Sequence, residues 1–192
     1  MALTDLTVTG LLDAFASSAP TPGGGSAAAM AGAMSASLLA MVATMTKTKS
    51  NTAEERSALD AAAAELLPLK AALTALIDAD AAAYDMVVAA YRHPKGTDEE
   101  KAARKAAIQE AMRVATETPL DTMKACAALV QLQAIVAEHG NINAASDVHV
   151  AGLLARAALH GAKSNVDINI PGISDPSIAA SLRAQADRFA IS

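Results

Sequence analysis

The stretch from Gly23 to Thr46 constrains the fold of this chain more than any other part of the sequence. It holds no charged residue, consists mostly of Ala, Gly, Ser and Met, and begins within the loop-like PTPGGG at 20–25. Its length would suit a membrane span, but small side chains gain little from burial in hydrocarbon, and a long charged sequence follows. We therefore predict a helix over 26–46 that is apolar nearly all round and buried on most sides within a bundle.

Small residues recur every four positions along this predicted helix, at Ala28, Gly32, Ala36 and Ala40. Such a row lets the backbone of a neighbouring helix approach closely. The spacing is compatible with a neighbour from the same chain and with one from a second subunit.

The composition favours helices along the whole chain. Of 192 residues, 53% are hydrophobic by a broad count and only 2% are aromatic. Alanine, the best helix former, supplies the largest share of the apolar residues. The length suits one domain. We expect residues 1–192 to form a single all-α domain, a multi-helix bundle around the long buried Ala-rich helix.

Net charge, cysteine content and the N-terminal sequence indicate the cellular compartment and the kinds of partner that this chain does not bind. The net charge of −5 argues against non-specific nucleic-acid binding. The single cysteine, Cys126, leaves no internal disulfide, fits a reducing compartment and lies in an apolar helical stretch, which indicates an inert buried thiol. The opening MALTDLTVTG lacks the basic and apolar segments of a secretory signal. The expected protein is cytoplasmic and binds neither nucleic acid nor membrane.

Proline and glycine residues indicate where the helical segments begin and end. Pro68 is expected to bend or divide its segment, Pro119 to begin a helix, and Gly140 to end that helix in a left-handed cap. Thr52 and Thr97 are each followed three residues later by Glu, the pattern of a capping box. Helices are expected over 4–17, 26–46, 52–92, 98–116, 119–139 and 146–170, with a short amphipathic helix in the tail.

The glycine-rich loop resembles a phosphate-binding turn only in its physics, because it lacks the lysine and hydroxyl of the P-loop pattern. Glycines at the start of a buried helix expose backbone N–H groups, which attract an anion or a carbonyl oxygen. The alternative is a plain flexible turn in which Ser26 is the N-cap. The candidate ligand-binding residues of this segment are Pro22, Gly23, Gly24, Gly25 and Ser26.

A carboxylate interrupts the apolar stripe of the segment 52–92. The stripe advances in steps of three or four residues, except that eight residues separate Leu76 from Tyr84, and Asp80 lies midway between them. Asp78 is rotated by about 200° from Asp80 and is expected to face elsewhere. A carboxyl group on an inner helix face is costly unless it is paired or keeps its proton, which suits acid–base chemistry. The alternative is a structural aspartate that ties two helices together.

Other polar side chains are candidates for a ligand site. Lys95, in HPKGT, precedes a predicted helix and could reach a pocket at the end of the bundle, although it could equally be a surface lysine. The asparagines at 165 and 169 share one helix face, but solvated helix ends and caps could also explain the polar cluster. The four histidines lack metal-ligand spacing, and no metal is expected. The remaining candidate binding residues are Tyr84, Asn141, Asn143, Ser146, Asp147, Asn165 and Asn169.

Several segments, in order along nearly the whole chain, resemble the formiminotransferase-cyclodeaminase/cyclohydrolase proteins of folate metabolism. They are SSAPTPGGGSAAA (17–29), LIDADAAAYDMVVAAYRHPKGTDEEKAAR (76–104), IQEAM..AT.TPL (108–120) and IVAEHGNINAASD (135–147). The likeness is strongest to the free-standing bacterial methenyltetrahydrofolate cyclohydrolases. It implies an all-helical fold, a homodimer formed through helices, and a tetrahydrofolate site near the subunit interface.

The resemblance also implies roles for individual residues. The proposed catalytic aspartate of the cyclodeaminase domain falls on Asp80, and the lysine of a PKNT-like motif falls on Lys95. The glycine-rich loop falls on residues 23–25 and the asparagine-rich segment on residues 141–147. Gly96 departs from the family pattern, in which an asparagine often stands at this position.

The leading functional hypothesis is hydrolysis of 5,10-methenyltetrahydrofolate to 10-formyltetrahydrofolate without a metal or cofactor. In it Asp80 is the general base and Lys95 stabilises oxyanion charge. One alternative is the cyclodeaminase reaction, in which ammonia leaves a formimino group and the same methenyl compound forms. The other is a folate-binding module without turnover.

Overall fold

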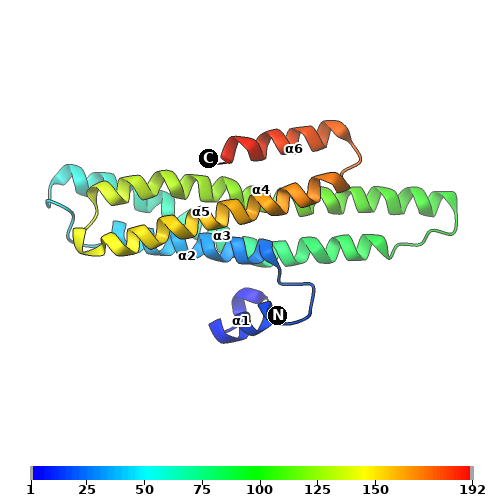
Figure 1. Ribbon diagram of the computed structural model, residues 1–192, viewed down its shortest axis with the longest axis horizontal. Coiled ribbons are helices and arrows are strands. Elements are labelled where there is room, and N and C mark those ends of the chain that lie inside the picture. The colour runs from blue at the N-terminus through cyan, green and yellow to red at the C-terminus, as the bar shows by residue number, and fades with distance from the viewer. Residues whose placement is uncertain (1, 191–192) are drawn as a thin grey trace.

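The computed structural model describes residues 2–190, so Met1, Ile191 and Ser192 of the expected domain lie outside the described residues. Within that range the chain is helical, with no β-strand (Figure 1). The α-helices are α1 (Val8–Phe15), α2 (Gly24–Ala43), α3 (Ala53–Tyr91), α4 (Asp98–His139), α5 (Ala145–Asn169) and α6 (Pro176–Phe189). Three short 3-10 turns, η1 (Leu3–Asp5), η2 (Ile142–Ala144) and η3 (Ile170–Gly172), join or precede them. The expected all-α bundle is confirmed.

Helices α2 to α5 lie side by side and alternate in direction, which makes an elongated antiparallel four-helix bundle (Figure 1). Helix α6 returns along the outside of the bundle, mainly over α4, and the short α1 lies off the opposite side (Figure 1). The last part of α3 and the first part of α4 continue past the other helices as a two-helix hairpin (Figure 1). Both long helices open with the expected capping boxes, at Thr52 with Glu55 and at Thr97 with Glu100.

Helix α2 is the buried Ala-rich helix that its composition predicts. The row of small residues faces the inside of its own bundle, since all four are buried, and a Cβ added at Gly32 would lie 2.9 Å from Cys126 Sγ and 3.0 Å from a Leu73 methyl. The close neighbours at Gly32 are therefore α3 and α4 of the same chain, and Ala28 lies against Gly161 of α5. The opposite face is open, and Met34 and Met41 are 47% and 41% exposed there.

Among residues 2–190, two helices, α2 and α4, are long and apolar enough to cross a membrane by length and composition alone. In α2, 61% of the apolar window is buried inside the bundle, as in the core helix of many globular proteins.

The expectation that Pro119 begins a helix is wrong, as is a division at Pro68, because α3 and α4 each continue through their proline. Proline has no N–H, so at position 119 the carbonyl of Ala115 loses its helical partner. Asn169, at the end of α5, replaces that partner: its Nδ2 donates to the Ala115 oxygen at 2.7 Å. A side chain from a different helix thus satisfies the carbonyl that the proline leaves free.

We expect Asn169→Ala to lower the free energy of unfolding by about 1–2 kcal/mol, because the Ala115 carbonyl loses its donor. The cost should fall by about 1 kcal/mol in a Pro119→Ala background, where the backbone N–H of the introduced alanine restores the helical bond. Urea denaturation of the four proteins of this double-mutant cycle measures the coupling. Equal costs in both backgrounds would contradict the proposed pairing.

Gly140 ends α4, but not in the expected left-handed conformation, since its φ of −69° and ψ of 167° are extended. The glycine is required by packing instead. An added Cβ would overlap the Val136 carbonyl oxygen and lie 3.0 Å from Val42 Cγ1.

Candidate functional site

Asp80 lies in the middle of α3 and is held against the first turn of α2. Its Oδ2 accepts a hydrogen bond from the backbone N–H of Ser26 at 2.7 Å and lies 3.0 Å from the Ser26 hydroxyl. The first-turn N–H groups of a helix have no partner within the helix and carry partial positive charge, so they are natural donors to a carboxylate. The aspartate expected on the inner face therefore pairs with a helix N-terminus.

Gly25 makes this close approach possible. A Cβ at this position would overlap Asp80 Oδ1 and lie within 2.5 Å of its Cγ. Gly23 and Gly24 are less constrained, because an added Cβ would find its nearest atoms at 3.8 Å and 3.5 Å. Of the three glycines in the loop, only Gly25 is sterically required by the carboxylate.

Burial raises the pKa of Asp80 above its ordinary value of 3.8, while the hydrogen bonds from Ser26 act in the opposite direction. The Ser26 hydroxyl also reaches the Ile77 carbonyl oxygen at 2.9 Å, and its single hydrogen can serve only one acceptor at a time. When that hydrogen points to Ile77, the serine oxygen is free to accept a hydrogen bond from the protonated carboxyl group of Asp80. The surroundings of Asp80 thus accommodate both the carboxylate and the carboxylic acid.

Asp80 and the glycine loop open onto a cleft of about 330 Å³, within the range of small-molecule sites. Asn165 and Asn169 line it from α5, and Tyr84, 41% exposed, lines it from α3. Both asparagines donate through Nδ2 to carbonyl oxygens, of Gly161 and Ala115 respectively, which fixes their orientation and leaves Oδ1 free to accept. The lining residues are Pro20, Thr21, Gly23, Gly24, Gly25, Asp80, Ala83, Tyr84, Val87, Met112, Ala115, Asn165 and Asn169.

Seven of the residues expected from the sequence therefore meet in this cleft, including all three loop glycines. Ser26 lies behind Asp80, fully buried, and acts on the cleft through that side chain. Pro22 belongs to the same loop, between the lining residues Thr21 and Gly23.

Lys95 is not brought to Asp80 within one chain. Helix α3 continues for eleven residues beyond Asp80, a rise of roughly 16 Å, and carries the HPKGT loop away from the cleft. Lys95 instead lines a second hollow along the α3–α4 hairpin, together with Lys101, Arg104 and Lys105.

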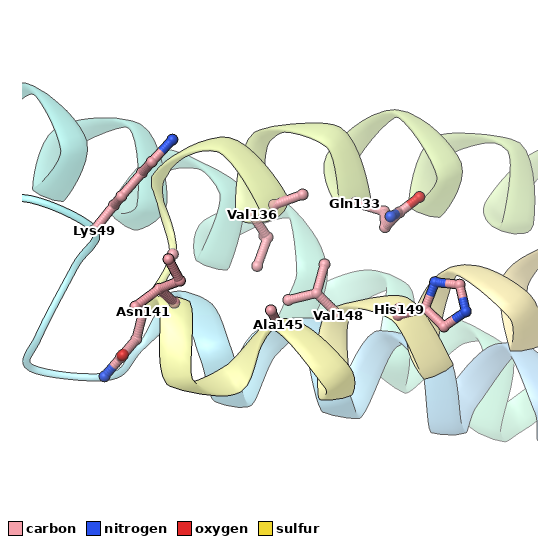
Figure 2. Close-up of a pocket in the computed structure, with 10 residues that line it drawn as sticks. Lys49, Gln133, Val136, Asn141, Ala145, Val148 and His149 are labelled. Atoms are coloured by element: carbon pink, nitrogen blue, oxygen red, sulfur yellow. The ribbon is translucent and has the colours of Figure 1, made fainter.

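The asparagine-rich segment lies at the other end of the bundle, at the turn from α4 to α5. Asn141 caps this turn by accepting from the Asn143 N–H at 3.0 Å. It also borders a hollow of about 330 Å³ that Lys49, Gln133 and His149 line as well (Figure 2). Helix α5 separates this turn from Asn165 by roughly 30 Å. Within one chain, Asn141, Asn143, Ser146 and Asp147 are thus remote from Asp80.

The expectations about Asp78 and Cys126 are confirmed. Asp78 points away from Asp80 and accepts from the Leu3 N–H and, at 2.6 Å, from the Thr4 hydroxyl, which ties the N-terminal turn to α3. Cys126 is fully buried, and burial raises the pKa of its thiol to about 12. Among residues 2–190, no three His, Cys, Asp or Glu side chains gather where they could hold a metal ion.

Sequence reasoning missed the apolar wall of the cleft. Met112 and Ala115 come from α4, whose part in the site follows from the antiparallel pairing of α3 with α4. Val87 was visible as a member of the apolar stripe, one turn beyond Tyr84. Ala83 and Pro20 carry no chemical signal that could distinguish them from packing residues.

The fold and the cleft define an all-helical protein in which a half-buried carboxylate is hydrogen-bonded to a glycine-rich helix N-terminus and opens onto a cleft. The chain belongs to the formiminotransferase-cyclodeaminase family, whose family model matches residues 7–188. The resemblance stated from the sequence is confirmed.

Two relatives show how the chain fits within this family. It is 46% identical over 173 residues to a methenyltetrahydrofolate cyclohydrolase of Methylorubrum extorquens, covering 90% of this chain and 83% of that protein. It is 37% identical over 166 residues to the formimidoyltransferase-cyclodeaminase of Sus scrofa. That match covers 84% of this chain but only 30% of the longer pig protein.

A solved structure has the same fold. The crystal structure of a formiminotetrahydrofolate cyclodeaminase from Thermotoga maritima matches with a TM-score of 0.84 at 28% identity. The match covers 96% of this chain and 88% of that one.

Proposed function

We propose that this chain is an enzyme that hydrolyses 5,10-methenyltetrahydrofolate to 10-formyltetrahydrofolate. The observation that carries the proposal is the 46% identity, over most of both chains, to a protein named methenyltetrahydrofolate cyclohydrolase. The cleft supports it, because it combines a base that can take up a proton with backbone donors and a space of suitable size.

In the proposed mechanism, Asp80 moves one proton. The methenyl carbon lies between two nitrogens that share a positive charge, so it is electrophilic without a metal. Asp80 takes a proton from the attacking water while the oxygen bonds to this carbon. The adduct then opens as its C–N5 bond breaks, N5 receives the proton from Asp80, and the hydroxyl proton leaves as the formyl C=O forms. One water is consumed and one proton is released overall.

The glycine loop stabilises charge in the same mechanism. The N–H of Ser26 already binds Asp80, but Gly24 and Gly25 lie in the first turn of α2 and also line the cleft. First-turn amides lack helical partners and favour negative charge. We assign them to the oxygen that gains charge as the adduct forms and opens. We assign the Oδ1 atoms of Asn165 and Asn169, which line the cleft, to accept from N–H groups of the pterin.

The test is the near-ultraviolet absorbance of methenyltetrahydrofolate, which disappears on hydrolysis. Purified protein is expected to accelerate this loss by at least about 100-fold over buffer, the range of a positioned general base. Treatment with a chelator should not change the rate. A rate equal to that in buffer would contradict the proposal.

The second candidate is the cyclodeaminase reaction, which the name of the Thermotoga maritima neighbour and the relationship to the pig protein favour. Asp80 could serve it equally, because N10 attack on a formimino carbon and loss of ammonia also need proton transfer. Appearance of the methenyl absorbance from 5-formiminotetrahydrofolate, without its loss from the methenyl compound, would favour this activity. Saturable folate binding with neither reaction would identify a binding module.

We further propose a cytoplasmic homodimer that uses no metal or organic cofactor and binds neither nucleic acid nor membrane. The open face of α2 supports the dimer, because Met30, Met34 and Leu38 line a shallow apolar hollow there. The net charge of −5 supports the absence of nucleic acid. A molar mass of one chain by light scattering would contradict the homodimer.

A further inference from the structure

The two oxygens of the Asp80 carboxyl group have different surroundings. Oδ2 accepts from the Ser26 N–H at 2.7 Å and lies 3.0 Å from the hydroxyl of the same serine. Oδ1 accepts no hydrogen bond from the described residues, and it is not among their buried side-chain atoms that lack a partner. Because Asp80 is half-buried and lines the cleft, Oδ1 is the oxygen that reaches solvent there.

The Ser26 hydroxyl contacts only α3. Ser26 is fully buried, and among the described residues the partners of its hydroxyl are Asp80 Oδ2 and, at 2.9 Å, the Ile77 carbonyl oxygen. A hydroxyl has one hydrogen to donate, and an ionised carboxylate is a stronger acceptor than a neutral carbonyl group. The hydrogen is therefore expected to point to Oδ2 whenever Asp80 is ionised, and to be free to turn to Ile77 when Asp80 carries a proton.

A proton that Asp80 takes from the cleft is expected on Oδ1. Oδ2 already accepts the Ser26 N–H, and protonation would make it a weaker acceptor for that bond. A proton on Oδ2 would also lie between the carboxyl group and the buried serine, away from the cleft. Oδ1 has neither disadvantage, and Gly25 keeps it uncovered, because a Cβ at this position would overlap it.

We propose that Ser26 is a positioning residue, which holds Oδ2 of Asp80 with its amide and its hydroxyl and so leaves Oδ1 as the atom that exchanges a proton with the substrate. The inference rests on the proposed function, in which Asp80 is the general base. The Oδ1–H bond forms as an O–H bond of the attacking water breaks, and it breaks again as N5 receives the proton and the C–N5 bond opens. Ser26 never touches the substrate.

Ser26→Ala is the test, because it removes the hydroxyl and keeps the backbone N–H. The ionised form of Asp80 loses a donor, so the pKa of Asp80 should rise further above its ordinary value. The acid limb of the kcat/KM profile should move to higher pH, and kcat/KM at a fixed pH on this limb should fall by about tenfold, the strength of one hydrogen bond to a charged group. Partial unfolding lowers the amount of active enzyme but leaves the limb in place. An unmoved limb would overturn the role of Ser26.

The limb reports on Asp80 because other charged groups lie elsewhere. Among the described residues that line the cleft, Tyr84 is the only other titratable side chain, and α2, α4 and α5 contribute none. Asp78, on the same helix, binds the N-terminal turn instead.

Ser35→Ala is the matched control. Ser35 lies on α2, is also fully buried, and also donates its hydroxyl to another helix, to the Ala151 carbonyl oxygen at 2.8 Å. The variant loses a comparable hydrogen bond without touching Asp80, so the limb should stay where it is in the wild type. A limb that moved equally in both variants would indicate a general loosening of α2 and would overturn the proposal.

A measurement without turnover separates this role from the proposed function. The ¹³C chemical shift of the Asp80 carboxyl carbon, followed against pH and assigned by its loss in Asp80→Asn, gives the pKa of this group in the wild type and in Ser26→Ala. A higher pKa in the variant would support the role of Ser26 even if neither protein hydrolysed methenyltetrahydrofolate, a result that would contradict the proposed function alone. Equal pKa values would overturn the role of Ser26 whatever the activity.

Discussion

Asp80→Asn is expected to lower kcat/KM for methenyltetrahydrofolate hydrolysis by about 10²–10⁴-fold, the usual contribution of general acid–base catalysis. Asparagine keeps the shape of aspartate and can still accept from the Ser26 N–H, but it cannot take a proton from water. The near-ultraviolet assay on the purified variant measures the loss. A variant within about tenfold of the wild type would remove Asp80 as the base.

Asp78→Asn is the control for this substitution, because Asp78 lies two residues away on α3 and binds the N-terminal turn instead of the cleft. The variant should retain most of the activity.

The pH profile of Asp80→Asn against the wild type gives a second readout. The wild-type kcat/KM should fall as pH drops through the raised pKa of Asp80, on a limb that lies above 3.8, and the residual activity of Asp80→Asn should lack this limb.

The raised pKa of Asp80 also affects how the free energy of unfolding depends on pH. A carboxyl group whose pKa is higher in the folded state than in the unfolded state stabilises the fold below its unfolded pKa, and this contribution is lost as pH rises through the folded pKa. Above its folded pKa, the ionised Asp80 therefore does not stabilise the bundle through its charge. Asp80→Asn should not lower the melting temperature, which separates its loss of activity from unfolding.

The main residues of the candidate site were predictable from the sequence, because a charged residue in an apolar helix stripe costs free energy when it is buried. Asp80 was visible as a charge in an apolar stripe, and the loop glycines were visible as a cluster before a charge-free helix. What the sequence could not show was that they touch. The contact depends on α2 and α3 packing antiparallel at one particular register, which brings Ser26 to Asp80 across 54 positions of the chain.

The differences between the sequence-based expectations and the structure of one chain also have physical causes. A proline usually ends a helix, but α4 continues through Pro119, and the amide of Asn169, 54 residues beyond Ala115, satisfies the carbonyl that this proline leaves free. Lys95 was placed at the end of the bundle, where a loop could fold back toward a pocket. In the structure α3 extends straight past the cleft, so the lysine lies with other cations near the tip of the hairpin.

Gly25→Ala is expected to reduce kcat/KM by about 100-fold or more, because one added methyl group displaces the carboxylate of Asp80, the proposed general base. The new Cβ would overlap Asp80 Oδ1, and Asp80 could avoid it only by leaving the Ser26 N–H. Misplacement of a catalytic group by about 1 Å can cost about 10²-fold. Overpacking should also lower the free energy of unfolding by about 1–3 kcal/mol, partly offset by the better helix propensity of alanine. Turnover and urea denaturation measure the two effects.

Gly23→Ala is the matched control two residues away, where the nearest atom to an added Cβ is 3.8 Å distant and the backbone φ of −121° suits alanine. It should change kcat/KM by less than about tenfold. The double variant Gly25→Ala/Asp80→Ala tests the cause, because removing the carboxylate gives the new methyl group room. It should therefore be more stable than Gly25→Ala alone, although inactive. If Gly25→Ala proved as active as Gly23→Ala, the carboxylate would not depend on its contact with the start of α2, and the proposed geometry of the site would be wrong.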